Sequence, residues 1–205
     1  MKIHAALMLK APIPGKVKTR LAVDIGEDEA AGVYQQLVEH QLTQIPSEWK
    51  ITIHFAPENQ EPLMLNWLGP LLPEDAEFIP QVPGDLGVRI SAAVCHGLQS
   101  GAEGVALIGG DCPGLTSGIL EAAAMSIGTV IGPAIDGGYV LLLLRQHDPS
   151  LFTNIDWSTE HVLAQTTSAL DRLGWNYHLL EPLEDVDDLA SWMRCQAADS
   201  AFKAS

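Results

Sequence analysis

Residues 3–21 read IHAALMLKAPIPGKVKTRL, and this stretch decides the fold. The run from Ile3 to Leu9 is apolar apart from one histidine, and a turn containing proline and glycine closes it. Such a run is typical of a strand that is buried on both faces of a parallel sheet. The next segment, residues 10–21, contains four cations, one glycine and no acid. The stretch therefore predicts a buried strand that leads directly into a cationic loop.

Strand-like and helix-like patterns alternate along the rest of the chain. Continuous apolar or β-branched runs predict strands, and apolar residues at helical spacing predict helices. The expected strands are 3–9, 51–55, 77–82, 105–108, 129–131, 139–144 and 175–180, and the expected helices are 27–44, 60–68, 86–98, 117–125, 159–173 and 185–196. This order is typical of an α/β fold with three layers, αβα, around a mostly parallel central sheet. Because no linker interrupts the pattern, we expect residues 1–205 to form a single domain.

The composition excludes several classes of protein. Apolar residues make up 47% of the 205 residues, which is typical of a globular chain. The net charge is −15, which excludes a surface that coats nucleic acid, because phosphates must be met by an excess of lysine and arginine. The three cysteines, Cys95, Cys112 and Cys195, are too few and too widely spaced for a disulfide framework. No apolar run is long enough to cross a membrane and no secretory signal is visible, so we expect a cytoplasmic protein.

The charge is unevenly distributed. Residues 1–20 contain five cations and no acid, so the other 185 residues carry a net charge of −20. In open α/β sheets ligands bind beyond the carboxyl ends of the strands, which is where the cationic loop is expected. Lys10, Lys18 and Arg20 would supply positive charge to phosphate groups. Gly15 would let the backbone turn close to these groups, and the backbone N–H groups from Gly15 to Thr19 would form an anion-binding nest. The loop lacks the Gly-x-x-x-x-Gly-Lys-Ser/Thr pattern of a P-loop, and a solvated basic loop is the alternative interpretation.

Two aspartates follow strands at the same predicted edge of the sheet. Asp111, in the segment IGGDCPG at residues 108–114, would hold Mg²⁺ or Mn²⁺ against the phosphates, because these hard cations bind oxygen ligands. Asp136, which Gly137 and Gly138 follow, would bind a hydroxyl group or a metal. The alternatives are a helix cap for Asp111 and an ordinary hairpin turn for Asp136.

The second half of the chain adds a metal candidate and an acceptor candidate. Asp185 and Asp187 occupy alternating positions before the last predicted helix, as a second metal ligand would. Acids at a helix N-terminus also offset the helix dipole, which is the alternative interpretation of this pair. Trp157 precedes another predicted helix and would form a wall of an acceptor pocket.

A third loop has the sequence QVPGDLGVR at residues 81–89. Gly84 and Asp85 would contribute to recognition of a base or sugar, and Arg89 would reach a phosphate or an acidic acceptor. The alternative for Asp85 is a cap on the helix predicted over residues 86–98.

Six segments together resemble a bacterial family of GT-A-like proteins, described as glycosyltransferases and in some cases linked to arsenosugar biosynthesis. They are residues 10–21, 84–89, 110–113, 132–139, 156–159 and 185–187. The resemblance implies the GT-A, or nucleotide-diphospho-sugar transferase, fold, which is Rossmann-like. The Lys-Thr-Arg-Leu end of the first loop also resembles the guanylyltransferase that activates phospholactate in deazaflavin cofactor synthesis, and the C-terminal Asp-x-Asp resembles the metal-binding end of sugar nucleotidyltransferases.

The chain departs from these families at two points. Pro113 stands where many GT-A glycosyltransferases have the second aspartate of Asp-x-Asp. The chain also lacks the Gly-x-Gly-x-x-Arg segment of sugar nucleotidyltransferases. A metal at Asp111 would therefore need a second ligand from Asp187 or Asp136.

The sequence predicts a metal-dependent glycosyltransferase that takes a nucleotide-diphosphate sugar and a small-molecule acceptor. The expected catalytic residues are Asp136 and Asp111, and the expected ligands for Mg²⁺ or Mn²⁺ are Asp111 and Asp187. The expected nucleotide-binding residues are Lys10, Gly15, Lys18, Thr19, Arg20, Gly84, Asp85 and Arg89. The expected acceptor-binding residues are Gly137, Gly138 and Trp157. One alternative is a nucleotidyltransferase that releases diphosphate from a nucleoside triphosphate. Another is a nucleotide-binding protein without catalysis, and the sequence leaves a homodimer open.

Overall fold

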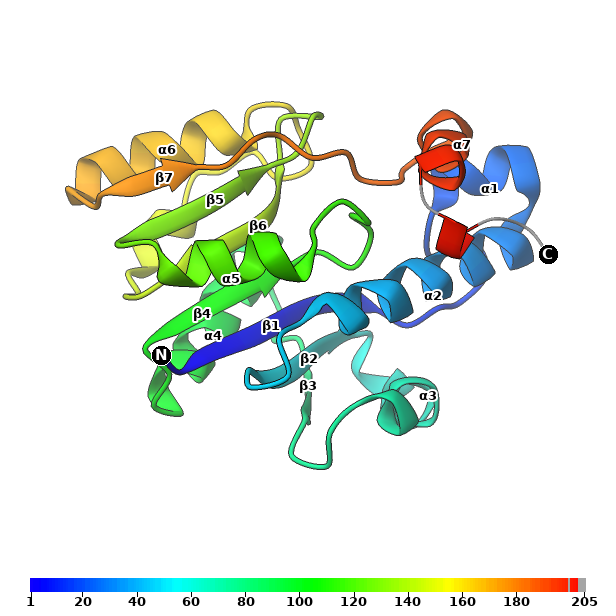
Figure 1. Cartoon of the computed structure of the whole chain (residues 1–205), viewed down its shortest axis with the longest axis horizontal. Helices are drawn as coiled ribbons and strands as arrows, with labels where there is room; N and C mark the ends of the chain where they lie inside the picture. The colour runs from blue at the N-terminus through cyan, green and yellow to red at the C-terminus, as the bar shows by residue number, and fades with distance from the viewer. Residues whose placement is uncertain (199, 203–205) are drawn as a thin grey trace.

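Seven strands form one sheet in the order β3-β2-β1-β4-β6-β5-β7 in a computed structural model that describes residues 1–198 and 200–202 (Figure 1). Strand β6 is antiparallel to both of its neighbours, and the other strand pairs are parallel. The strands are β1 (Ile3–Lys10), β2 (Lys50–Ala56), β3 (Glu77–Pro80), β4 (Gly104–Ile108), β5 (Thr129–Pro133), β6 (Tyr139–Leu144) and β7 (Tyr177–Leu179). The mostly parallel sheet expected from the sequence is confirmed.

Helices cover both faces of this sheet. They are α1 (Thr19–Ile25), α2 (Glu27–Gln44), α3 (Glu61–Leu68), α4 (Leu86–Gln99), α5 (Ser117–Met125), α6 (Val162–Leu173) and α7 (Leu189–Ala198), with short 3-10 turns at Glu58–Gln60, Gly69–Leu71, Pro149–Phe152 and Ser200–Phe202. One apolar cluster joins the sheet to α2, α3 and α5, and another joins it to α4 and α6. Figure 1 shows α2 and α5 in front of the sheet and α4 behind it. The three-layer αβα arrangement is therefore confirmed.

Strand β1 lies in the middle of the sheet and contributes to both clusters. Leu7 and Leu9 pack toward α2 and α5, and Ala6 packs toward α4, because successive side chains of a strand point to opposite faces. Its neighbours β2 and β4 both run parallel to it. This explains why the run from Ile3 to Leu9 is apolar without alternation.

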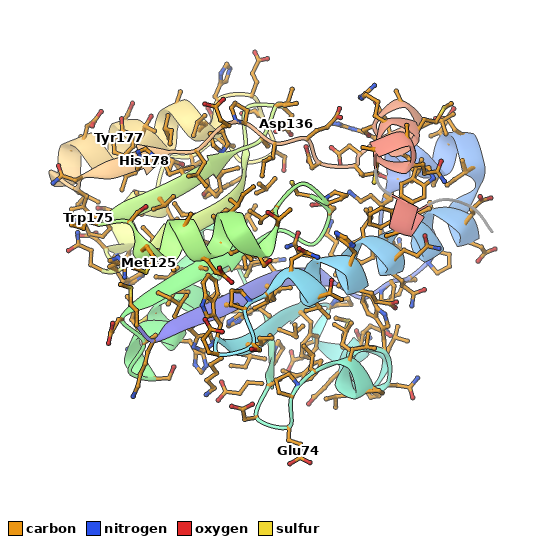
Figure 2. The ribbon with its side chains drawn as sticks, viewed as in Figure 1. Glu74, Met125, Asp136, Trp175, Tyr177 and His178 are labelled. Carbon is orange, nitrogen blue, oxygen red and sulfur yellow. The ribbon has the colours of Figure 1, made fainter. Side chains whose placement is uncertain are left out.

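The carboxyl ends of β1 and β4 and the loop between β5 and β6 meet at one edge of the sheet. Because β6 runs antiparallel to β5, the loop that joins them turns at this same edge. Figure 2 shows Asp136 in this loop, with Met125 and Trp175 near the opposite edge. The edge therefore gathers three segments in which the sequence predicted site residues.

A third apolar cluster stands beyond this edge. It joins α1, α2 and α7 through buried side chains that include Leu21, Val33, Leu37, Trp192 and Phe202. Val186, from the extended segment before α7, is buried in the same cluster. The cluster thereby fixes the C-terminal segment against the loop that follows β1.

Three differences concern the helices. The helix expected over residues 159–173 begins only at Val162, because residues 157–161 form an irregular turn in which Ser158 has a φ of 64°. The last helix begins at Leu189 rather than near residue 185, because the carboxylate of Asp188 accepts a hydrogen bond from the backbone N–H of Ser191 at 2.8 Å and caps it. The helix Thr19–Ile25 was not predicted, and it takes Thr19, Arg20 and Leu21 out of the cationic loop. In the described part of the chain, no helix combines the length and the apolar character that crossing a membrane requires.

Candidate functional site

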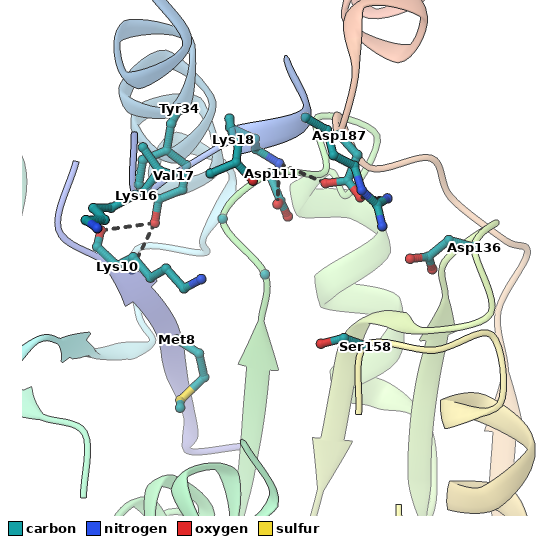
Figure 3. A pocket seen from close by; sticks show the side chains of 14 residues that line it. Met8, Lys10, Lys16, Val17, Lys18, Tyr34, Asp111, Asp136, Ser158 and Asp187 are labelled. Atoms are coloured by element: carbon teal, nitrogen blue, oxygen red, sulfur yellow. Dashed lines mark hydrogen bonds and ion pairs between the residues drawn. The ribbon is translucent and has the colours of Figure 1, made fainter. Parts of the chain in front are cut away.

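A cavity of about 520 Å³ opens at the carboxyl edge of the sheet (Figure 3). We call it the charged cavity, because cations line one part of it and carboxylates another. It is lined by Met8, Lys10, Lys16, Val17, Lys18, Thr19, Arg20, Tyr34, Gly109, Gly110, Asp111, Asp136, Ser158 and Asp187. Seven predicted site residues therefore lie together in one cavity, namely the four cationic-loop residues Lys10, Lys18, Thr19 and Arg20 and the three aspartates Asp111, Asp136 and Asp187.

Lys18 is the buried cation of this cavity. Its side chain is only 5% exposed, and its ammonium group donates to Asp111 Oδ2 at 2.6 Å and to Asp187 Oδ1 at 3.4 Å. Burial alone lowers the pKa of a lysine, but the charges and hydrogen bonds of Asp111 and Asp187 outweigh burial and raise the pKa of Lys18. Its backbone adopts the left-handed conformation, with φ 45° and ψ 44°, which is uncommon for a residue with a side chain. Lys18 is therefore charged, and its ammonium group is held by ion pairs with Asp111 and Asp187.

Three aspartates form a carboxylate triad at this ammonium group. Oxygens of Asp111, Asp185 and Asp187 all lie within 4.8 Å of one another. Burial, followed by the negative charges of Asp111, Asp187 and Asp136, raises the pKa of Asp185 to about 6. Clustered, partly buried carboxylate oxygens are the donor set that Mg²⁺ and Mn²⁺ prefer.

The position of Val186 explains why Asp185 and Asp187 share one side of the chain. Val186 packs into the apolar cluster of α1, α2 and α7, and its backbone N–H donates to the carbonyl oxygen of Asp111 at 2.9 Å. In an extended segment the residues on either side of a buried residue point the other way. Both carboxylates are thereby directed toward Asp111.

The remaining cations surround the open part of the charged cavity. The Tyr34 hydroxyl holds the end of β1, because it accepts from the backbone N–H of Lys10 at 3.0 Å and donates to the carbonyl oxygen of Lys10 at 3.2 Å. Figure 3 shows the Lys10 side chain pointing from the end of β1 into the cavity. Arg20 is 77% exposed, and one guanidinium nitrogen lies 3.5 Å from Asp187 Oδ2. Lys10 and Arg20 are therefore more accessible to a ligand than Lys18.

Asp136 lies across the cavity from Lys10 (Figure 3). Its Oδ1 accepts from the backbone N–H of Gly138 at 2.9 Å, so the turn that was an alternative interpretation is present. Gly137 has φ 91°, and a Cβ atom on it would lie 2.4 Å from the carbonyl oxygen of Glu160. This turn presents Asp136 to the cavity, so the structural and functional interpretations are compatible.

A second cavity of about 290 Å³ adjoins the first. We call it the apolar cavity, and it shares Met8, Gly109, Asp136 and Ser158 with the charged cavity. The rest of its lining is Leu86, Ile90, Leu107, Ile108, Gly138, Tyr139, Val140, Trp157, Thr159 and Val162. Two predicted acceptor-binding residues, Gly138 and Trp157, thus line one cavity.

Residues 41–159 match the model of a family described as "Uncharacterized protein conserved in bacteria (DUF2064)". The chain belongs to the DUF2064 family. The match covers more than half of the sequence, and its range includes both Asp111 and Asp136. No curated protein matches the DUF2064 chain in sequence.

Solved structures share the complete fold of this DUF2064 chain. A proposed nucleotide-diphospho-sugar transferase from Desulfovibrio desulfuricans G20 is 26% identical over 99% of this chain and 98% of its own, with a TM-score of 0.84. A 4-diphosphocytidyl-2C-methyl-D-erythritol synthase is 13% identical over 97% and 98%, with a TM-score of 0.57. A CMP:2-keto-3-deoxy-manno-octonic acid synthetase complexed with CTP is 10% identical over 97% and 98%, with a TM-score of 0.55. The expected nucleotide-diphospho-sugar transferase fold is confirmed.

Five predicted ligand-binding residues of the DUF2064 chain line neither cavity, and Gly137 is one of them. Gly15 faces Glu27, whose carboxylate atoms would lie about 2.9 Å from a Cβ atom at that position. Asp85 caps α4, because its Oδ1 accepts from the N–H of Val88 at 2.9 Å. Arg89 donates to the Gly84 carbonyl oxygen at 3.0 Å, within its own loop. Ligand binding by Gly15, Gly84, Asp85, Arg89 and Gly137 stays a prediction.

Other residues of the site were not among the predicted site residues. Lys16 lies in the predicted cationic loop, so its charge was the available signal. Asp185 belongs to the carboxylate triad, and the signal that could have added it to the metal ligands was its alternating spacing with Asp187. No local pattern marks Tyr34, which reaches β1 from α2, or Ser158, whose φ of 64° is visible only in the structure.

Proposed function

We propose that this chain is a metal-dependent glycosyltransferase that takes a nucleotide-diphosphate sugar as donor. The observation that carries the proposal is the juxtaposition of the cationic segment after β1 with the carboxylate triad, which Lys18 joins through Asp111. Both lie at the carboxyl edge of the sheet, where ligands of α/β folds bind. The name of the structure from Desulfovibrio desulfuricans, a proposed nucleotide-diphospho-sugar transferase, agrees with this assignment.

The carboxylate triad fits a divalent cation. Its oxygens lie within 4.8 Å of one another, and burial, followed by the negative charges of the neighbouring carboxylates, raises the pKa of Asp185 to about 6. Asp111, Asp185 and Asp187 would hold Mg²⁺ or Mn²⁺. The bound ion would offset the negative charge that develops on the diphosphate leaving group.

The cations of the charged cavity would bind the diphosphate itself. Lys10 and Arg20 are accessible, and Lys18 lies beside the triad, so the leaving group would be neutralised from two sides. Because charge increases on the diphosphate as its bond to the sugar breaks, these contacts strengthen in the transition state.

Asp136 would act as the general base. It lines both cavities, and the backbone N–H of Gly138 fixes one of its oxygens. Asp136 would take the proton of an acceptor hydroxyl while the hydroxyl oxygen forms a bond to the anomeric carbon of the donor. The bond from that carbon to the diphosphate oxygen breaks, and the nucleoside diphosphate leaves with the electron pair.

A nucleotidyltransferase is the second candidate. Four cations, Lys10, Lys16, Lys18 and Arg20, line the charged cavity, which is enough positive charge for a triphosphate. The neighbour in complex with CTP has this fold as well. In this reaction a substrate phosphate oxygen would attack the α-phosphorus of a nucleoside triphosphate, and diphosphate would leave.

A panel of ligands separates these candidates. UDP-glucose, GDP-mannose, CTP and GTP are each added with Mn²⁺ or with EDTA, and the melting temperature, nucleoside diphosphate release and diphosphate release are measured. For a glycosyltransferase, a nucleotide sugar raises the melting temperature only with Mn²⁺ and releases nucleoside diphosphate when a mixture of alcohols is added. Diphosphate release from a triphosphate, with no reaction of either sugar nucleotide, would overturn this assignment in favour of nucleotidyl transfer. Binding without turnover of any ligand would leave a non-catalytic nucleotide-binding protein.

A further inference from the structure

We propose that the apolar cavity binds the body of a small uncharged acceptor, with the acceptor hydroxyl directed at Asp136. This inference rests on the proposed function and names the class of acceptor. It excludes acceptors that present a phosphate or a carboxylate to this cavity.

The charge of the lining argues against an anionic acceptor. Among the residues described, those that line the apolar cavity include no lysine, arginine or histidine. Asp136 is its one acidic residue, so a phosphate or carboxylate placed there would meet a like charge without a compensating cation. A neutral hydroxyl group avoids this cost and has Asp136 as its hydrogen-bond acceptor.

The aromatic wall argues for an acceptor with a hydrophobic body. The lining includes the indole of Trp157 together with Met8, Leu86, Ile90 and Val162. A Cβ atom at Gly87 would lie 2.9 Å from Trp157 Nε1 and 2.4 Å from the carbonyl oxygen of Phe152, so the glycine lets the indole lie close to α4. Aromatic faces and aliphatic side chains stabilise flat or apolar ligand groups by removing their surface from water.

The size and position of the cavity set two further limits. A volume of about 290 Å³ lies at the lower end of the range for small-molecule pockets, roughly 300–1,000 Å³, so the acceptor is small. Asp136, Gly109, Ser158 and Met8 belong to both cavities. A molecule in the apolar cavity therefore reaches the charged cavity at Asp136, where the bond to the sugar would form.

The indole N–H signals of the five tryptophans provide a direct test. The ¹⁵N-labelled protein is titrated with 2-phenylethanol and with glycerol in the presence of Mg²⁺, and the Trp157 signal is assigned with a Trp157→Phe variant. We expect 2-phenylethanol to shift the Trp157 signal saturably and at least tenfold more tightly than glycerol. Equal binding of glycerol, or no saturable shift with either alcohol, would overturn the proposal.

Two variants on α4 locate the binding site. Leu86 lines the apolar cavity at its rim and is 38% exposed, so Leu86→Phe narrows the cavity without changing a fully buried side chain. Val88 lies on the same helix, is 50% exposed and lines neither cavity, which makes Val88→Phe the matched control. We expect Leu86→Phe to weaken 2-phenylethanol binding at least fivefold and Val88→Phe to leave it unchanged. Equal effects of the two variants would place the alcohol elsewhere and overturn the proposal.

The same samples distinguish this inference from the proposed function. If UDP-glucose or GDP-mannose displaces 2-phenylethanol and shifts the Trp157 signal, the donor occupies the apolar cavity and the acceptor proposal is wrong, while the glycosyltransferase proposal stands. If neither sugar nucleotide binds, but 2-phenylethanol still binds at Trp157, the proposed function is wrong. The apolar cavity would still be a binding site for small uncharged alcohols.

Discussion

The Lys18 ammonium group lies 2.6 Å from Asp111 Oδ2, although the two residues are 93 positions apart in the sequence. The same ammonium group lies 3.4 Å from Asp187 Oδ1. One buried cation therefore neutralises part of a carboxylate triad that would also bind a metal. A metal ion bound as proposed would compete with the Lys18 ammonium group for the same negative charge.

This competition predicts opposite effects of Lys18→Met on two ligands. Without the lysine, the triad retains its full negative charge, so Mn²⁺ alone should bind about tenfold more tightly. Binding of a nucleoside diphosphate should weaken by about the same factor, because a charge-assisted contact is lost. Titration calorimetry with Mn²⁺ alone and with UDP or GDP measures both changes.

Arg20→Gln is the matched control for Lys18→Met. It removes one positive charge at a side chain that is 77% exposed and 3.5 Å from Asp187, so water screens most of its effect. Its effect on Mn²⁺ binding should stay within about threefold. If Lys18→Met bound Mn²⁺ more weakly than the unmodified protein, a competition between Lys18 and the metal ion would be contradicted.

Asp111→Asn and Asp185→Asn should each weaken Mn²⁺ binding by at least about tenfold, because each removes a charged oxygen ligand. Asp85→Asn is the control, since it changes the total charge equally and asparagine still caps α4. Electron paramagnetic resonance of Mn²⁺ measures the free ion in each case. A similar loss in Asp85→Asn would mean that net charge, rather than the triad, determines binding.

Asp136→Asn should lower kcat by about 10²–10⁴-fold with little change in donor affinity, because the amide cannot accept the proton. Asp156→Asn is the control, because Asp156 lies on the nearby 156–159 segment, lines neither cavity and bonds to Gln165. Single-turnover kinetics with the donor identified in the ligand panel separates the chemical step from binding. An unchanged kcat in Asp136→Asn would remove the general-base role.

Gly110 is needed for packing behind Asp111. A Cβ atom there would lie 2.7 Å from Leu9 Cδ2 and 2.9 Å from Val38 Cγ2. Gly110→Ala should therefore lower the free energy of unfolding by about 1–3 kcal/mol. Gly118→Ala, where no atom lies within 4 Å of the new Cβ, should be neutral or slightly stabilising. Urea denaturation of both variants tests the difference.

A histidine cluster predicts how stability depends on pH. His4 on β1 and His54 on β2 are buried, and each ring lies 5.9 Å from the ring of His96 on α4. Burial, and then the charge of His96, lower the pKa values of His4 and His54 to about 4. Lys50 and Glu77 also face this cluster, and Glu77 bonds to His96 at 2.8 Å.

The unfolded chain takes up these protons near pH 6.5, whereas the folded protein takes them up only near pH 4. The contribution of these histidines to the free energy of unfolding should therefore be fully present above pH 6.5. It should fall as the pH drops toward 4, by roughly 1.4 kcal/mol per pH unit for each histidine. His54→Phe should halve this slope in urea denaturation series, and exposed His178→Gln should preserve it. An equal slope in His54→Phe and the unmodified protein would contradict the prediction.

Short-range patterns in the sequence determined most of the fold. The helix Glu27–Gln44 has the bounds predicted from apolar residues at helical spacing, and the strand Tyr139–Leu144 has those predicted from a continuous apolar run, because such patterns record which faces of an element are buried. The apolar run before Lys10 likewise predicted a buried strand. Helix Thr19–Ile25 escaped prediction because it is only seven residues long and its first turn is cationic.

The tertiary structure decided which candidate residues meet. Burial of Val186 in the cluster of α1, α2 and α7 turns Asp185 and Asp187 toward Asp111, and no local pattern specifies that contact. The sequence by itself determined that cations and carboxylates follow strands at one edge of the sheet. The cap of α4 by Asp85 is local, and the sequence already offered it as an alternative. Only the folded chain determined that Lys18 contacts both Asp111 and Asp187, because such contacts depend on packing between segments far apart in the sequence.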